Sequence, residues 1–246
     1  MKPGFRIVIP ARYASVRLPG KPLRDVCGKP MIEWVYLAAR QSEASEVVVA
    51  TDDQRIVDRV SEFGGTACLT DASHRSGTDR ILEVAQKLEW SQDSIVVNLQ
   101  GDEPLMPAAN ITQVARNLAS HDCAMATLHK RIGIDAARDP NQVKLVQDEN
   151  GYALYFSRAM IPYDRDGAFD QYLGHIGIYA YRVGFLEAFS KLAPCELELA
   201  ESLEQLRALC NCYPIHSAEA SANPGPGIDT EEDLARVVAI MESNQA

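Results

Sequence analysis

Short apolar runs alternate with longer amphipathic stretches along the first half of the chain. The runs have the length and composition of buried strands. They occupy residues 5–9, 46–50, 66–69, 94–99 and 123–128. The stretches between them predict helices at residues 30–39, 54–63, 76–88 and 107–119. Strands and helices that alternate with short connections predict a mostly parallel α/β sheet with helices on both faces.

The pattern changes after residue 130. Two strand-like segments, 143–147 and 152–156, flank Asn150-Gly151 and predict a β-hairpin, and residues 157–170 are irregular. A strand over residues 174–181 follows, then helical segments at 183–191 and 203–210, and a strand at 213–217. We also expect residues 197–207 to form a helix. Thr230 and Asp233 have the spacing of a capping box that begins the last helix. We interpret residues 131–173 as an insertion, a lid or a dimer contact or both, in a single domain spanning residues 1–246.

Composition narrows the class of protein. With 246 residues, of which 46% are hydrophobic, the chain can bury one large core. No apolar run approaches the roughly 20 residues that span a bilayer, and the N-terminus passes into a strand without a signal peptide, so we expect a cytoplasmic protein with no membrane partner. Six cysteines fit that compartment as reduced thiols, and we interpret Cys210 and Cys212 as structural. A net charge of −10 argues against nucleic acid as a partner.

A cationic loop follows the first strand. Pro10 has no N–H to donate and is expected to end the strand; residues 11–21 then contain Arg12, Arg17 and Lys21 and no acid. Open α/β sheets bind ligands at the carboxyl ends of their strands. The loop is either a solvated basic segment or, as its position favours, a site for a polyanion such as a triphosphate.

Carboxylates occur at two other strand or helix ends. Asp102 and Glu103 follow the run at residues 94–99, and Asp229 precedes the last helix. Mg²⁺ takes one or two carboxylates and leaves its other positions to phosphate and water. The chain contains neither a P-loop nor a Gly-x-Gly-x-x-Gly dinucleotide motif. Cations for a triphosphate and separate aspartates for a metal suit nucleotidyl transfer.

Several motifs in order along the chain resemble one family. They include Ile-Pro-Ala-Arg-Tyr-Ala-Ser-Val-Arg-Leu-Pro-Gly-Lys-Pro-Leu, Ala-Thr-Asp-Asp, Ser-Gly-Thr-Asp-Arg, Asn-Leu-Gln-Gly-Asp-Glu-Pro, Ala-Leu-Tyr-Phe-Ser-Arg-Ala and Leu-Glu-Gln-Leu-Arg. Together they resemble the 3-deoxy-manno-octulosonate (Kdo) cytidylyltransferases, also called CMP-Kdo synthetases. The resemblance implies a nucleotide-diphospho-sugar-transferase-like (Rossmann-like) fold, a homodimer, Mg²⁺, and conversion of CTP and Kdo to CMP-Kdo and diphosphate for lipopolysaccharide synthesis.

The same resemblance implies roles for individual residues. The nucleotide set is Ala11, Arg12, Ser15, Arg17, Lys21, Ser76, Gly77, Arg80 and Gln100. The sugar-acid set is Gln100, Arg158, His175, Tyr179, Glu204 and Gln205, in which Arg158 and His175 supply positive charge for the substrate carboxylate. Asp102 and Asp229 are the expected metal ligands, and with Arg17 and Lys21 they form the expected catalytic set.

Several of these residues also have a purely structural interpretation. Ser76 has the position of an ordinary helix N-cap, His175 that of a satisfied strand histidine, and Glu204 and Gln205 those of exposed helix residues. Glu103 is expected only to support its neighbours.

The chain also departs from the family pattern. Residues 162–174 are shorter than in many members, which affects the expected lid and dimer contacts. Leu199, Ala200 and Ser202 differ from a version with larger residues, which leaves room for a modified Kdo, such as its 8-amino analogue, paired by Glu198 or Glu204. CMP-sialic acid synthetase is a further alternative, although its loop has Gly-Gly-Ser where this chain has Tyr-Ala-Ser. A non-catalytic nucleotide-sugar-binding protein is the alternative from another class.

Overall fold

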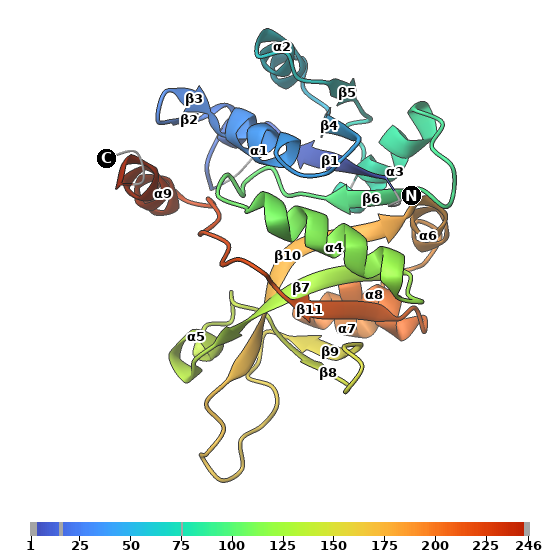
Figure 1. The fold of residues 1–246 in the computed structure, drawn as a ribbon, viewed down its shortest axis with the longest axis vertical. Coiled ribbons are helices and arrows are strands. Elements are labelled where there is room, and N and C mark those ends of the chain that lie inside the picture. The colour runs from blue at the N-terminus through green and yellow to red at the C-terminus, as the bar shows by residue number, and fades with distance from the viewer. Residues whose placement is uncertain (1–3, 15–16, 75, 244–246) are drawn as a thin grey trace.

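A central sheet with helices on both faces organises the molecule (Figure 1). The structure is a computed structural model that describes residues 4–14, 17–74 and 76–243. Across the described strands the order is β11-β7-β10-β6-β1-β4-β5. Their bounds are β1 Phe5–Ala11, β4 Glu46–Thr51, β5 Ala67–Leu69, β6 Ile95–Asn98, β7 Met125–Ile132, β10 Tyr172–Arg182 and β11 Ile215–Glu219. β1 pairs in parallel with β4 and β6, whereas β10 runs antiparallel to β6 and β7, so the mostly parallel prediction is confirmed.

Alternate residues of the central strands face two separate cores. Ile7 and Ile9 of β1 pack in one core against α1, α2 and α4, and Val8 packs in the other against α3, α6 and α8. Burial on both faces explains why these strands are continuous apolar runs. The helices are α1 Met31–Arg40, α2 Gln54–Glu62, α3 Gly77–Lys87, α4 Ala108–Ser120, α5 Ile134–Arg138, α6 Val183–Phe189, α7 Glu196–Glu201, α8 Gln205–Cys210 and α9 Glu231–Ser243.

The prediction that Pro10 ends the first strand is wrong. β1 continues to Ala11, and Pro10 pairs with Ala50 of β4. The pairing of β1 with β6 ends at Val8, so Pro10 lies where one side of β1 no longer has a partner strand. A residue without an N–H is tolerated at such a position.

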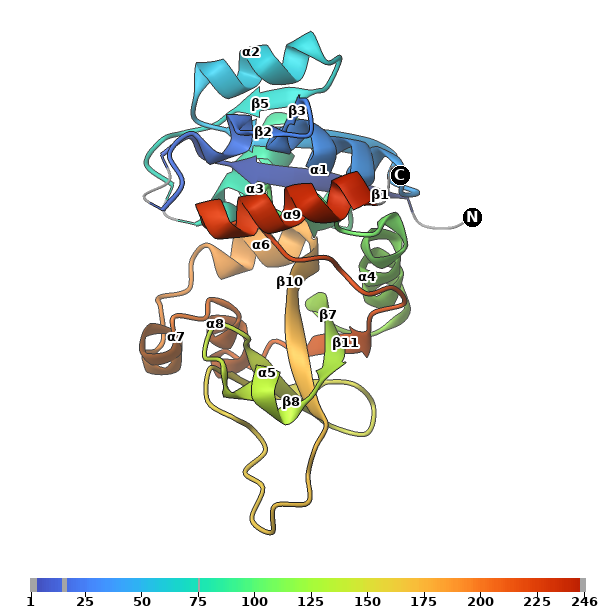
Figure 2. The same cartoon turned by 90° about the vertical axis from the view of Figure 1, so that its left-hand side faces the viewer.

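The insertion contains the predicted hairpin, formed by β8 (Lys144–Gln147) and β9 (Ala153–Ser157). At its turn, Gly151 has φ +84°, and a Cβ there would lie 2.9 Å from Nε2 of His216. Figure 2 shows the segment between β9 and β10 projecting away from the rest of the molecule. The sequence did not predict α5, which also lies in this insertion.

The segment expected at residues 203–210 contains α8, but the helix expected over residues 197–207 is interrupted. Ser202, with φ +52°, ends α7, and α8 begins at Gln205. The capping box before α9 is confirmed, because the Thr230 N–H donates to the Asp233 carboxylate (3.1 Å) and the Thr230 hydroxyl accepts from the Asp233 N–H (3.2 Å). Smaller elements connect β1 to α1: a 3-10 turn at Lys21–Leu23 and the β2–β3 ribbon, Asp25–Val26 with Lys29–Pro30. Among the described residues, no helix is both long enough and apolar enough to span a bilayer.

Two stacked imidazoles join β11 to the end of α4. The rings of His216 and His121 lie 3.6 Å apart between centroids, with 19° between their planes. His216 is 6% exposed. Burial and, to a smaller extent, the charge of His121 lower the pKa of His216 from 6.5 to about 4. The fold therefore holds His216 neutral.

This arrangement predicts an acid-sensitive fold. The folded pKa of His216 is below the unfolded value, so its contribution to stability is complete above about pH 6.5 and is lost as the pH falls toward about 4. The free energy of unfolding should drop by about 2–3 kcal/mol over that range from this group alone. Urea titrations give the free energy of unfolding at each pH. Between about pH 6.5 and pH 4, this free energy should fall less steeply with decreasing pH in His216→Gln than in the wild type. Equal slopes would contradict the assignment.

Candidate active site

A cleft of about 230 Å³ opens where β1 and β6 end, beside the segment that precedes α9. It gathers most of the residues predicted for the triphosphate and the metal. These are Ala11, Arg12, Arg17, Lys21, Gln100, Asp102 and Asp229. Gly101 allows the β6 loop to approach β1, since a Cβ there would lie 2.8 Å from the Pro10 carbonyl oxygen. The Ile228 N–H donates to the Asp102 carbonyl oxygen (2.9 Å), which places the two aspartate segments side by side.

The Lys21 ammonium lies between the two aspartates. Its Nζ is 2.5 Å from Oδ2 of Asp102 and 2.9 Å from Oδ1 of Asp229. Arg17 adds a contact of 3.1 Å to the same oxygen of Asp229. Burial by itself lowers the pKa of Lys21, but the charges and hydrogen bonds of the two aspartates outweigh it and raise the pKa. Lys21 is therefore a fixed positive charge at neutral pH.

This arrangement fits a divalent cation. Both carboxylates face one position, which a cation, the lysine ammonium, occupies. Among the described residues, no group of three or more His, Cys, Asp or Glu side chains is arranged to hold a metal. Two carboxylates are the number that Mg²⁺ commonly takes from a protein when phosphate and water complete its shell.

Glu103 lies beside this pair of aspartates and is partly buried. Burial and, next, the charge of Asp102 raise the pKa of Glu103 to about 7. Glu103 therefore resists ionisation, because a further negative charge beside Asp102 is unfavourable.

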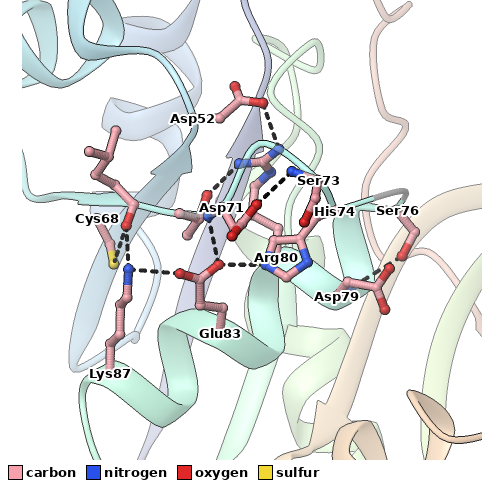
Figure 3. Close-up of polar contacts among 12 residues, drawn as sticks. Asp52, Cys68, Asp71, Ser73, His74, Ser76, Asp79, Arg80, Glu83 and Lys87 are labelled. Atoms are coloured by element: carbon pink, nitrogen blue, oxygen red, sulfur yellow. Dashed lines mark hydrogen bonds and ion pairs between the residues drawn. The ribbon is translucent and has the colours of Figure 1, made fainter.

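Loops after β5 and at the start of α3 form the next part of the site (Figure 3). Ser76 accepts a hydrogen bond from the Asp79 N–H (3.1 Å), so the N-cap interpretation is confirmed. Arg80 is fully buried; it donates to the Thr70 hydroxyl and pairs with Asp52 at 3.0 Å. Arg12 donates to the His74 carbonyl oxygen, which joins this loop to the cationic loop. A Cβ on Gly77 would lie 3.4 Å from Cγ of Pro10, so α3 begins close to the end of β1.

Three of the six predicted sugar residues line one cavity, whereas Gln100 lines the first cleft. Tyr179, Glu204 and Gln205 line an enclosed cavity of about 30 Å³, and Ser76 and Glu204 line an adjoining cleft of about 480 Å³. The Thr78 hydroxyl donates to Glu204 (2.5 Å), and Gln205 is 7% exposed. The exposed-helix interpretation is therefore wrong for Gln205. Glu198, considered above as a partner for a substrate amine, is paired with Arg207 at 2.5 Å.

His175 corrects one expectation. Burial and, next, the charge of His129 lower the pKa of His175 to about 3, so the imidazole is neutral near pH 7 and cannot supply positive charge. Its Nε2 lies 3.0 Å from the Thr127 hydroxyl, and its ring packs 5.3 Å from that of Tyr179, measured between centroids. The satisfied strand histidine is the interpretation that this geometry supports, although the ring still lies beside a predicted sugar residue.

Arg158 lies in the insertion and reaches the junction of α7 and α8. Its guanidinium donates to the carbonyl oxygens of Glu201 (2.7 Å), Pro140 (3.0 Å) and Ser202 (3.4 Å). The Glu201 carboxylate accepts from the Arg158 N–H (2.9 Å) and from the Ser157 hydroxyl (2.6 Å). The guanidinium remains the cation of the predicted sugar set.

The structure also identifies supporting residues that sequence reasoning did not select: Asp52, Thr78 and Glu201. Asp52 belongs to the Ala-Thr-Asp-Asp motif, so the sequence alone could have indicated it as a candidate site residue. Thr78 likewise belongs to the Ser-Gly-Thr-Asp-Arg motif, whereas Glu201 is recognisable only from its contacts. Ser15 lies outside the described residues.

Together, the sheet and its cationic, two-aspartate cleft define an α/β nucleotidyltransferase. Residues 6–215 match the family model described as "Cytidylyltransferase". Curated 3-deoxy-manno-octulosonate cytidylyltransferases are similar along almost the whole chain. The protein from Pseudomonas fluorescens is 54% identical over 99% of this chain and 100% of its own, and that from Vibrio parahaemolyticus is 52% identical over 96% and 98%.

Solved structures agree with these relatives. CMP:2-keto-3-deoxy-manno-octonic acid synthetase in complex with CTP is 45% identical, has a TM-score of 0.94 and covers 98% of this chain and 99% of that chain. A putative glucose-1-phosphate thymidylyltransferase from Bacillus anthracis, 15% identical with a TM-score of 0.68 over 96% of this chain and 95% of its own, shares the fold. The chain belongs to the 3-deoxy-manno-octulosonate cytidylyltransferase family, and it is a nucleotidyltransferase enzyme.

The contribution of the Asp52–Arg80 ion pair to the stability of the protein can be tested by mutation. Asp52→Asn removes the charge opposite a fully buried guanidinium, and we expect the free energy of unfolding to fall by about 3 kcal/mol. Glu231→Gln is the control, because Glu231 pairs with Arg24 on the surface (2.8 Å), and it should change stability by at most about 1 kcal/mol. If denaturant titrations gave the same loss in the free energy of unfolding for both variants, Asp52 would not be needed to compensate the buried charge of Arg80.

Proposed function

We propose that this chain transfers the cytidylyl group of CTP to 3-deoxy-D-manno-octulosonate, forming CMP-Kdo and releasing diphosphate. The observation that carries the proposal is the similarity of nearly the full chain to curated 3-deoxy-manno-octulosonate cytidylyltransferases. The cleft lined by three cationic residues and two aspartates supports it. The sugar's anomeric hydroxyl attacks the α-phosphorus and gives up its proton to solvent; the new O–P bond forms, and the bond from the α-phosphorus to the departing diphosphate breaks.

The cationic loop would bind the triphosphate. Arg12, Arg17 and Lys21 line the cleft, and Lys21 is held as a fixed ammonium. Fixed cations stabilise the charge that develops on the departing diphosphate without reorganising during the reaction. Ala11, Ser76, Gly77, Arg80 and Gln100 are proposed to surround the nucleoside, with Arg80 acting through the loop that it anchors to Asp52 and Thr70. Ser15 is included on family resemblance alone.

Mg²⁺ is the proposed cofactor, with Asp102 and Asp229 as its ligands. When bound it would neutralise charge on the phosphates and help to align the reacting groups. Lys21, at present between the two carboxylates, has phosphate oxygens as an alternative partner once nucleotide binds.

The sugar acid is proposed to bind beside α3, near Gln100, Tyr179, Glu204 and Gln205. Arg158 would supply the cation for its carboxylate, and neutral His175 a hydrogen bond. Support for Kdo over a sialic acid is that both relatives above bear the Kdo name. An 8-amino Kdo stays an alternative substrate, for which Glu204 is the available acid because Glu198 is paired with Arg207.

The family resemblance also supports a homodimer in the cytoplasm that serves lipopolysaccharide synthesis. The segment projecting between β9 and β10 carries exposed aromatic rings, Tyr163 at 87% and Phe169 at 41%. Apolar rings on a projecting segment suit contact with a second copy, and we propose this insertion as the dimer contact rather than as a lid alone.

Asp102→Asn tests the metal assignment. The change keeps the side chain's size but removes one of two carboxylate charges, so kcat should fall by at least about 10²-fold. Diphosphate release at saturating Mg²⁺ measures it. Near-normal turnover would exclude Asp102 as a metal ligand.

Lys21→Ala tests the triphosphate site. Loss of the ammonium should raise the KM for CTP or lower turnover, while the apparent affinity for the sugar acid changes little. Lys29→Ala is the matched control, since Lys29 is a half-exposed lysine paired with Glu33 (2.6 Å) on α1. If the affinity for the sugar acid fell while the KM for CTP and the turnover were unchanged, the cationic loop would belong to the sugar-acid site instead.

A panel of sugar acids tests the substrate. With CTP we expect turnover of Kdo and little of N-acetylneuraminate, and Arg158→Ala should cost roughly 2–5 kcal/mol in kcat/KM for Kdo. The 8-amino analogue should compete no better than Kdo. A preference of more than about tenfold for the amine (about 1.4 kcal/mol) would make the modified sugar the natural substrate.

A further inference from the structure

A completely buried lysine contacts the backbone of the arginine predicted to bind the sugar acid. Lys144 is the first residue of β8 and is 0% exposed. Its Nζ donates to the carbonyl oxygens of Arg158 (2.6 Å) and Asp139 (3.0 Å). In the part of the chain that the structure describes, no carboxylate is in ion-pair contact with this ammonium. Two backbone carbonyl groups therefore hold it.

A cation is costly in this position. Burial lowers the pKa of Lys144, although the charges of Asp139 and, next, Glu201 act in the opposite direction. A lowered pKa means that the surroundings disfavour the charged form of the side chain. Methionine has a similar length and would fill the same space without a charge to bury. The packing of β8 therefore does not require an ammonium, and the specific contribution of Lys144 is its pair of carbonyl contacts.

The Arg158 side chain joins the same two segments of the chain. Its Nη1 donates to the carbonyl oxygen of Pro140 (3.0 Å), which is the residue after Asp139. Lys144 thus holds both sides of this contact, because it binds the backbone of Arg158 and the backbone next to the acceptor. Without the ammonium, neither segment would be fixed to the other through β8.

The guanidinium that is held in this way has donors to spare. Among the described residues, its contacts with the carbonyl oxygens of Pro140, Glu201 and Ser202 use one N–H of each nitrogen. A second N–H remains on Nη1 and on Nη2. A carboxylate can accept two parallel hydrogen bonds from such a fork, and Arg158 is only half-buried. The guanidinium can therefore receive a carboxylate as long as its position is maintained.

We propose that Lys144 is a positioning residue for the sugar-acid site. By holding the carbonyl groups of Arg158 and Asp139, it keeps the guanidinium where its remaining N–H groups meet the substrate carboxylate. Lys144 acts through Arg158 and does not itself touch the sugar acid. This role in substrate binding rests on the proposed function, whereas the dependence of the Arg158 position on Lys144 does not.

Lys144→Met tests the role by kinetics. We expect kcat/KM for Kdo to fall about tenfold with the KM for CTP unchanged. In an Arg158→Ala background, the same change should lower kcat/KM for Kdo by less than about twofold, because the arginine that the lysine positions is already absent. Equal fold losses in the two backgrounds, or an equal rise in the KM for CTP, would overturn the proposal.

Leu145→Ala is the matched control for loosening of the hairpin. Leu145 is the next residue of β8 and is 1% exposed. Its truncation should lower the urea midpoint of unfolding and leave kcat/KM for Kdo within about twofold of the wild type. A loss as large as that in Lys144→Met would show that any weakening of β8 has the same effect, and the lysine would have no positioning role.

A crystal structure of Lys144→Met tests the position of Arg158 without any substrate. We expect its Nη1 to lie more than about 3.5 Å from the Pro140 carbonyl oxygen, beyond hydrogen-bond distance. An unchanged contact would overturn the proposal. Absence of Kdo turnover in the wild type would instead refute the proposed function, and the crystal structure would still decide whether Lys144 positions Arg158.

A second variant covers a failure of Lys144→Met to fold. Lys144→Gln, whose amide can donate to one of the two carbonyl oxygens, then takes its place in each measurement, with a loss in the same direction expected. If neither variant folds, Lys144 is needed for the fold itself, and the proposal is overturned.

Discussion

The ion pair of Lys21 with Asp102 and Asp229 is the interaction on which the rest of the site depends. It joins residues 81 and 208 positions apart in sequence. Without the ammonium, two carboxylates would face each other in a cleft, where like charges are unfavourable. The lysine therefore draws together the loop after β1, the loop after β6 and the segment that leads into α9. The same geometry describes a position for a positive ion between two acids.

The fold supplies this arrangement through β1. Because β1 is central and buried on both faces, its end is fixed by two cores rather than by the loop that follows it. Gly101 lets the β6 loop approach Pro10, and the hydrogen bond from Ile228 to Asp102 holds the C-terminal segment alongside. The cationic residues can then remain on a loop, since the strands beneath them set its position. Ser76 and Asp79, at the start of α3, line a second cleft together with residues of α7 and α8.

The sequence predicted the parts of the fold that local patterns determine. Strands such as β1 and β4 are apolar runs because both faces are buried, and the turn at Gly151 and the cap at Thr230 depend on neighbouring residues. Local patterns did not predict that β1 passes through Pro10, which depends on where its pairing with β6 stops. They also missed the break at Ser202, because nothing about a serine requires the left-handed conformation found there.

The site shows the same division. Charged residues that follow strand ends, such as Lys21 and Asp102, were predictable because parallel strands bring their carboxyl ends together. The protonation state of His175 was not predictable from the sequence, because the burial that keeps the imidazole neutral comes from packing between strands. Asp52 likewise acquires its importance from Arg80, whose complete burial the sequence does not reveal.

A crystal structure with CTP and Mg²⁺ tests the central claim most directly. The account predicts a metal ion between Asp102 and Asp229, at about 2.1 Å from a carboxylate oxygen of each, with Nζ of Lys21 moved onto phosphate oxygens. A structure in which nucleotide and metal are bound elsewhere, while Lys21 still bridges the two aspartates, would contradict it.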